Sequence, residues 1–212
     1  MPPSTGHSLG RASMRLILSA AVNTMTQASV LSRHAPASAR SELSAAFEAF
    51  WRALPKDGLV PNRAVFRPER APRFLRHLLL CEALPDGQSC IRMRLVGSEF
   101  AARVQRDLKG EDYLQYLPQA YHAAAIESVR QIVHRPCGLW QIMPVSYERG
   151  FAHHIELTVF PLGPGPDGKH LMLVLTQTVP ALVMPTPTGD KVMTTDTALA
   201  YRYIDLGAGV PD

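Results

Sequence analysis

The chain has 212 residues, of which 46% are hydrophobic and 19% are charged, and its formal net charge at pH 7 is +4. This composition is ordinary for a globular chain and supplies enough apolar side chains for one core, so we expect one domain with extensions. The mild basic excess permits an acidic partner without requiring one. No segment approaches the roughly 20 consecutive apolar residues that span a bilayer, so we expect no membrane-spanning helix.

Residues 1–40 are rich in Ser, Ala, Pro and Thr and lack sustained hydrophobic periodicity, so we expect a flexible N-terminal extension. A short apolar run over residues 16–22 follows two arginines and weakly resembles an export signal. Because the run ends quickly at Asn23, we favour a cytoplasmic chain over an exported one. A translation start later than Met1 is a further alternative.

Residues 41–54 are predicted to form a helix, because Ser41 suits a helix N-cap and Pro55 ends the pattern. One apolar stripe at helical spacing comprises Leu43, Ala46, Phe47, Phe50, Trp51 and Leu54. Two interpretations remain open at this point. The stripe packs on its own domain, or it pairs with the same helix of a second subunit and buries Phe50 and Trp51 at a symmetric interface.

A second helix is predicted to begin at Pro68, where the missing N–H of proline costs nothing. Four arginines recur there at intervals of three, namely Arg67, Arg70, Arg73 and Arg76. They form either a solvated helix face or a basic stripe that binds phosphate or an acidic partner. Nucleic-acid binding is the weaker alternative, because no helix-turn-helix is recognisable and no aromatic residues interleave with the arginines.

Residues 78–84 and 89–96 are predicted to form a hairpin around the turn at residues 85–88. We expect Arg94 on the second strand to pair with Glu82 or Glu156. The three cysteines, Cys81, Cys90 and Cys137, form no CxxC pair, and we interpret them as reduced thiols of a cytoplasmic protein.

After Gly97 the chain is predicted to leave the sheet in short helical pieces that extend to Leu117. A longer helix opens at Pro118 and reaches about His134. Three more strands follow, over residues 139–143, 151–160 and 169–178. In the last of these, one set of alternating side chains (Leu171, Leu173 and Leu175) faces opposite to the other (Met172, Val174 and Thr176).

This order of helix, two strands, several helices and three strands predicts an α+β fold. Its sheet would have five antiparallel strands with helices on one face. Residues 180–212 are rich in Pro and Thr, and we interpret them as a linker and a C-terminal tail. The tail is expected to lie back on the domain of residues 41–179 through Tyr201, Tyr203 and Ile204.

Several motifs carry a resemblance to a known family, over roughly residue 41 to the C-terminus. They are Val60-Pro61-Asn62-Arg63, Arg94-Leu95-Val96-Gly97-Ser98, Arg106-Asp107-Leu108-Lys109-Gly110, Phe160-Pro161-Leu162 and the tail from Tyr203 to Pro211. The ordered set resembles small stand-alone bacterial PAS proteins of the PAS_5 family. One departure is Gln105, which stands where a glycine is usual in that family.

The resemblance implies a PAS-like five-stranded antiparallel sheet with short helices on one face and a flanking helix at residues 41–54. It also implies a sensor or protein-interaction module for signal transduction, and it favours a homodimer through the flanking helix. The partner signalling protein is unknown. No kinase, cyclase or DNA-binding motif accompanies the domain, so we expect the output to pass through another protein.

A cavity between the sheet and the short helices is the candidate site for a small apolar or amphipathic ligand. The expected lining residues are Phe100, Val104, Tyr113, His122, Ile126, Leu139, Gln141, Leu157 and Leu173. Tyr113 and Gln141 would supply the polar contacts that orient a ligand. The alternative is that these side chains simply fill the core.

The cofactor is unknown from the sequence. His122 is a candidate axial haem ligand, because PAS domains that hold haem commonly use a histidine from this region. The competing interpretation is a core histidine bonded to a backbone carbonyl. Flavin chemistry is disfavoured, since the Asn-Cys-Arg motif of flavin-binding PAS relatives is absent and residues 98–117 contain no cysteine.

Catalytic and metal-binding motifs are absent from the sequence, which has no GxSxG, no phosphate-cradling glycine loop and no HExxH. His153 and His154 are neighbours in a predicted strand and would point to opposite faces, so they would not share one metal. We therefore expect no enzyme and no metal centre.

Overall fold

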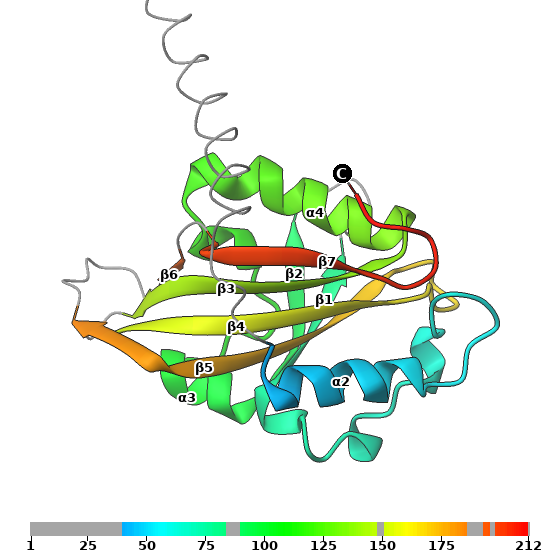
Figure 1. The fold of residues 1–212 in the computed structure, drawn as a ribbon, viewed down its shortest axis with the longest axis horizontal. Helices are drawn as coiled ribbons and strands as arrows, with labels where there is room; N and C mark the ends of the chain where they lie inside the picture. Colours follow the sequence, from blue (N-terminus) through cyan, green and yellow to red (C-terminus); the bar gives the residue numbers. More distant parts are fainter. Residues whose placement is uncertain (1–39, 84–89, 148–150, 186–192, 196–197, 212) are drawn as a thin grey trace, which may run out of the picture. The chain divides into compact units, whose positions relative to one another are not determined.

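One antiparallel β-sheet forms the centre of the fold, shown in Figure 1 for the computed structural model. The structure describes residues 40–83, 90–147, 151–185, 193–195 and 198–211. Of the extension predicted over residues 1–40 only Arg40 is described, and the predicted turn at residues 85–88 lies outside these ranges. The helices are α2 (Glu42–Arg52), α3 (Ser98–Val104) and α4 (His122–His134), and the strands are β1 (Leu78–Ala83), β2 (Ile91–Val96), β3 (Cys137–Tyr147), β4 (Phe151–Leu162), β5 (Leu171–Pro185), β6 (Met193–Thr195) and β7 (Ala200–Asp205).

The strand order confirms the predicted fold and extends it. Along the sheet the order is β2-β1-β5-β4-β3-β6, and β7 also pairs with β3. The five predicted strands are β1 to β5. The prediction of five strands was too low for the described residues, because the C-terminal segment adds β6 and β7 along the outer edge of β3. The last predicted strand also ends later than Thr178, at Pro185.

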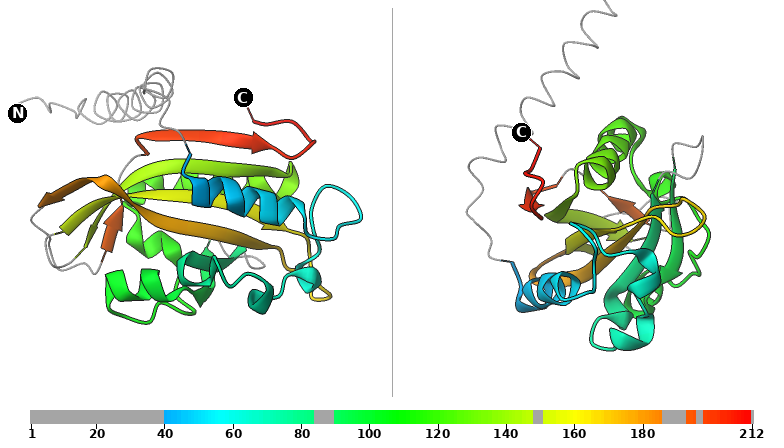
Figure 2. Two further views of the ribbon diagram at one scale, coloured as in Figure 1. Left: turned by 60° about the horizontal axis from the view of Figure 1, so that its bottom comes forward. Right: turned by 90° about the vertical axis from the view of Figure 1, so that its right-hand side faces the viewer.

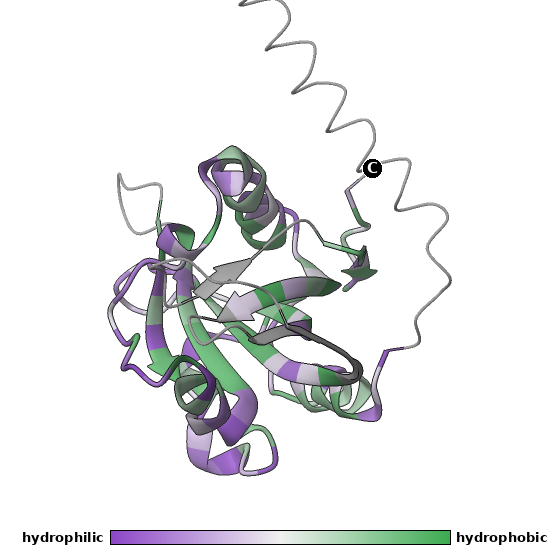
Figure 3. Ribbon diagram, turned by 90° about the vertical axis from the view of Figure 1, so that its left-hand side faces the viewer, coloured by the Kyte–Doolittle hydropathy of each residue, from purple (hydrophilic) through white to green (hydrophobic). Residues whose placement is uncertain are grey.

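Alternation along the strands separates two cores, one on each face of the sheet. On one face Leu79, Cys81 and Ile155 belong to a core that includes side chains of α3 and α4. On the other face Leu78 and Phe160 belong to a core that includes side chains of α2. The sheet therefore lies between α2 on one side and α3 with α4 on the other (Figure 2). Figure 3 shows apolar residues along the strands and polar residues on the outward faces of the helices.

Helix α2 packs on its own domain, which was the first of the two interpretations. Ser41 is its N-cap, and the Ser41 side chain accepts a hydrogen bond from the Ser44 amide. Phe47 is 0% exposed and Trp51 is 1% exposed. The indole N–H of Trp51 also donates to the Pro161 carbonyl at 2.8 Å. Trp51 is thus unavailable to a second subunit, and pairing through the rest of the helix remains a prediction.

The helix predicted at Pro68 does not form. Residues there make the short 3₁₀ helices η2 (Pro68–Arg70) and η3 (Leu75–His77), and η1 (Arg63–Val65) precedes them. The reason is Pro72, which lacks an N–H and disfavours helical angles at the preceding residue, Ala71, whose φ is −119°. The four arginines therefore do not share a helix face.

Short segments follow β2 as predicted, although the second is a 3₁₀ helix, η4 (Tyr113–Tyr116). Helix α3 ends at Val104, and its C-cap residue Gln105 has a φ of 54°, in the left-handed region that favours glycine. Glycine would adopt this conformation at lower cost than glutamine. The chain then pairs with the outer edge of β2, since the Gly110 amide donates to the Met93 carbonyl at 2.7 Å. Another 3₁₀ helix, η5 (Gln119–Tyr121), leads into α4.

In the described part of the chain, no helix combines the length and the apolar character needed to cross a membrane.

Candidate functional site

The face of the sheet toward α3 and α4 gathers most of the predicted lining residues. Phe100 and Val104 reach it from α3, and both are buried. Leu139 is buried on β3, while Ile126 and Leu157 are half-buried against the same core. The structure thus brings together side chains from α3, α4 and the central strands, and their role in lining a ligand site stays a prediction.

The predicted polar pair is also brought together. The Tyr113 hydroxyl donates to the Met143 sulfur at 3.9 Å, and the Gln141 amide nitrogen donates to the same sulfur at 3.7 Å. Tyr113 is on η4 and Gln141 is on β3, so two elements converge at this point. A thioether is a weak acceptor, and a ligand oxygen in its place would be a stronger one.

His122 lies at the start of α4, and its ring is bonded to the backbone. Its Nε2 is 3.1 Å from the Leu117 carbonyl oxygen, which accepts the hydrogen bond. This contact matches the interpretation of a histidine bonded to a backbone carbonyl. A haem iron would have to displace that bond or use Nδ1, and haem ligation remains an untested alternative.

The prediction for Leu173 was wrong about the face of the sheet. Leu173 is 0% exposed, but it belongs to the core beneath α2. Its neighbours Met172 and Val174 face α3 and α4 instead. Alternation separates the two sets along β5, but it does not say which set faces which helix.

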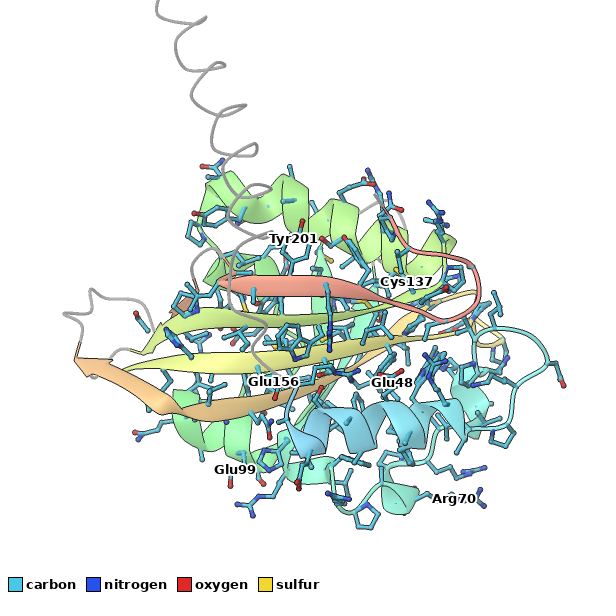
Figure 4. All side chains as sticks on the ribbon, in the orientation of Figure 1. Glu48, Arg70, Glu99, Cys137, Glu156 and Tyr201 are labelled. Carbon is cyan, nitrogen blue, oxygen red and sulfur yellow. The ribbon has the colours of Figure 1, made fainter. Side chains whose placement is uncertain are left out.

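A buried polar network occupies the opposite face, where α2 begins. Glu156 on β4 is 3% exposed, and Figure 4 shows it at the first turn of α2. It accepts hydrogen bonds from the Ser41 amide at 3.0 Å and from the Trp140 indole at 2.6 Å. The Gln177 side chain donates to its second oxygen. One carboxylate therefore ties the N-terminus of α2 to β3, β4 and β5.

A second contact extends this network. The hydroxyls of Ser44 and Thr158 lie 2.5 Å apart, and both residues are buried. A carboxylate at a helix N-terminus is also favoured by the helix dipole. The sequence alone suggested Glu156 only as one of two partners for Arg94, and Arg94 pairs with the other predicted partner, Glu82.

Hydrogen bonding decides the charge of Glu156. Burial alone would raise the pKa of this carboxyl group, but the bonds from Ser41, Trp140 and Gln177 outweigh burial and lower the pKa below 4.5. Glu156 is therefore ionised at neutral pH while it holds the N-terminus of α2.

Among the described residues no group of three or more His, Cys, Asp or Glu side chains is arranged to hold a metal ion. His153 and His154, singled out from the sequence, are both half-buried on β4. The buried cysteines Cys81 and Cys137 are free thiols.

Comparison with known proteins gives one family. The family model described as a PAS domain, PAS_5, matches residues 39–176. Among solved structures, a fungal LOV domain photoreceptor is 21% identical with a TM-score of 0.36, and the match covers 48% of this chain and 73% of that one. No curated protein matches the chain.

Proposed function

The chain belongs to the PAS_5 family of PAS domains, which are sensory and signalling modules, and we propose that it relays a change at one face of its sheet to α2 and then to a partner protein. The face that receives the change is the one covered by α3 and α4. We place the protein in the cytoplasm, and the proposal contains no catalytic step.

One observation carries this proposal. Adjacent residues of the same strands serve the two faces: Gln141 beside Trp140 on β3, and Leu157 beside Glu156 on β4. A strand that shifts to accommodate a ligand on one face must therefore move the network that holds α2 on the other. The relay needs no other element between the two faces.

The ligand class follows from the lining. The side chains from α3, α4 and β3 are largely apolar, while Tyr113 and Gln141 direct two donors at one point. We propose a small amphipathic molecule with an acceptor oxygen, which replaces the Met143 sulfur as the acceptor for both donors. The binding energy would favour one of two arrangements of the sheet.

The test is the native mass and absorbance spectrum of the purified full chain. We expect an added small mass or, for a bare protein, a thermal shift with amphipathic carboxylic acids. Gln141→Leu should weaken the affinity for the ligand at least about tenfold, because it removes one hydrogen-bond donor. The added mass or the thermal shift should fall accordingly. The control Gln115→Leu makes the same change at an exposed position of η4 and should have no effect.

Other outcomes of this test are informative. The absence of both an added mass and a thermal shift would contradict the ligand proposal. A Soret band that His122→Ala abolishes would replace the proposed ligand with haem. A doubled native mass would support the homodimer through α2.

A further inference from the structure

The outer edge of β3 is occupied by the chain's own C-terminal strand. Six residues of β7 pair with β3, from Cys137 opposite Asp205 to Ile142 opposite Ala200. Within the described residues β7 pairs with β3 alone. The family match ends at residue 176, before β6 and β7. In the strand order of the matched segment, β3 would therefore be an open edge if the tail were absent.

The middle of β7 is held mainly by its backbone. Tyr201 is 41% exposed and Arg202 is also exposed, although its guanidinium lies 5.1 Å from the ring centre of Trp140. Tyr203 packs half-buried against the core on the α4 side, and Ile204 against the core on the α2 side. Side chains alternate between two shallow contacts, as they do in a bound extended peptide.

The end of the tail is fixed by one buried side chain and a tight turn. Leu206 is 7% exposed in the core beneath α2. The Asp205 carboxylate accepts from the amides of Gly207 at 2.7 Å and Gly209 at 3.0 Å. Arg52 of α2 donates to the Asp205 carbonyl at 2.9 Å. The contacts that define the tail therefore include α2 directly.

A backbone ladder, alternating shallow side-chain contacts and one anchored leucine are the features of peptide recognition by strand addition. We propose that the β3 edge is a peptide-binding site whose intramolecular occupant is β7. Its external ligand is an extended segment of a partner protein that pairs with β3 in place of β7. That segment carries an aromatic residue at the position of Tyr203 and an aliphatic residue at that of Leu206.

The inference rests on the proposed function in one respect: it identifies the partner protein of that proposal as one that contributes an extended segment. Arg52 of α2, which donates to the tail, would connect α2 to that segment. The binding reaction itself is tested separately, since it needs no small ligand. A second copy of the chain that exchanges its β7 is the competing occupant, and the experiment distinguishes it.

The experiment uses the full folded chain with a site-specific protease sequence inserted between residues 189 and 190. After cleavage we expect the C-terminal fragment to stay bound and to be displaced by a labelled synthetic peptide of residues 190–212, which spans both β6 and β7. The control peptide with Leu206→Ala should bind at least about 30-fold more weakly, because it loses a buried leucine. The far-UV circular dichroism of the remaining domain should change little when the fragment leaves.

Three results would overturn the proposal. The first is that the fragment leaves only when the whole domain unfolds, which would make β7 an integral strand of the domain. The second is that the control peptide binds as tightly as the native one, which means that the site does not recognise the side chain of Leu206. The third is that uncleaved chains form dimers by exchanging β7, which would make a second copy of the chain the occupant of the β3 edge.

Discussion

Replacement of Glu156 by Gln tests the network that holds α2. The amide keeps the shape of the carboxylate but removes its charge, and its NH₂ group would face the donor of Gln177. Hydrogen bonds to a charged acceptor contribute roughly 1 kcal/mol more than neutral ones. With three donors affected, from Ser41, Trp140 and Gln177, the free energy of unfolding should fall by about 2–3 kcal/mol at pH 7.

The pH dependence of this difference follows from the pKa of Glu156. That pKa is lowered in the folded chain from its ordinary value of 4.5, because hydrogen bonds to the carboxylate outweigh its burial. The carboxylate thus stabilises the fold fully above the unfolded-state pKa, and its contribution is lost as the pH falls through the folded-state pKa. Glutamine does not titrate, so the gap between wild type and variant should be constant near pH 7 and should close below pH 4.5.

Urea unfolding at pH 7 and at pH values below 4.5 measures the gap. The matched control is Glu42→Gln, which removes an exposed carboxylate from the first turn of the same helix and should cost less than about 1 kcal/mol. A gap for Glu156→Gln that equals the control, or that persists unchanged at low pH, would refute the reasoning.

Two further predictions concern backbone packing and thiol reactivity. Gly97→Ala should lower the free energy of unfolding, measured in urea, by about 2 kcal/mol or more, because its Cβ would lie 2.6 Å from two backbone oxygens. The Cβ of Gly110→Ala would meet nothing within 4 Å, so that variant should lose only about 1 kcal/mol, for its φ of 88°. Equal losses would contradict the close packing at Gly97. N-ethylmaleimide at pH 8 should modify the native protein at Cys90 first, because Cys90 is half-buried whereas Cys81 and Cys137 are buried. Burial raises the pKa of all three thiols, to about 12 for Cys81 and about 11 for Cys137. Three rapid adducts in the intact mass would contradict this prediction.

The sequence predicted the elements and the order of the fold well, because strand alternation and helix stripes are local properties. It failed at Pro68, where a spacing of three between arginines resembled a helix. The two prolines, Pro68 and Pro72, permit only short 3₁₀ turns. It also failed to predict the exposed strand β7, because that strand is held by pairing with β3 rather than by an apolar pattern of its own.

The candidate site was predictable in part for a similar reason. Alternation showed that Leu173 and Val174 face opposite ways, but the choice of face depends on which helix covers it. Glu156 is a single carboxylate in an apolar strand, and its role depends on Ser41, which is 115 residues away in the sequence. A contact of that kind becomes visible only once the chain is folded.

Amide hydrogen exchange in α2 tests the relay through the sheet most directly. Gln141→Glu places a carboxylate on the face toward α4, and the control Leu114→Ala disturbs the same core from η4, off the strands. The two variants are compared under conditions of equal global stability. The account predicts that amides in the first half of α2 exchange at least about tenfold faster in Gln141→Glu than in the control, because the network at Glu156 has moved. Equal exchange in the two variants would contradict it.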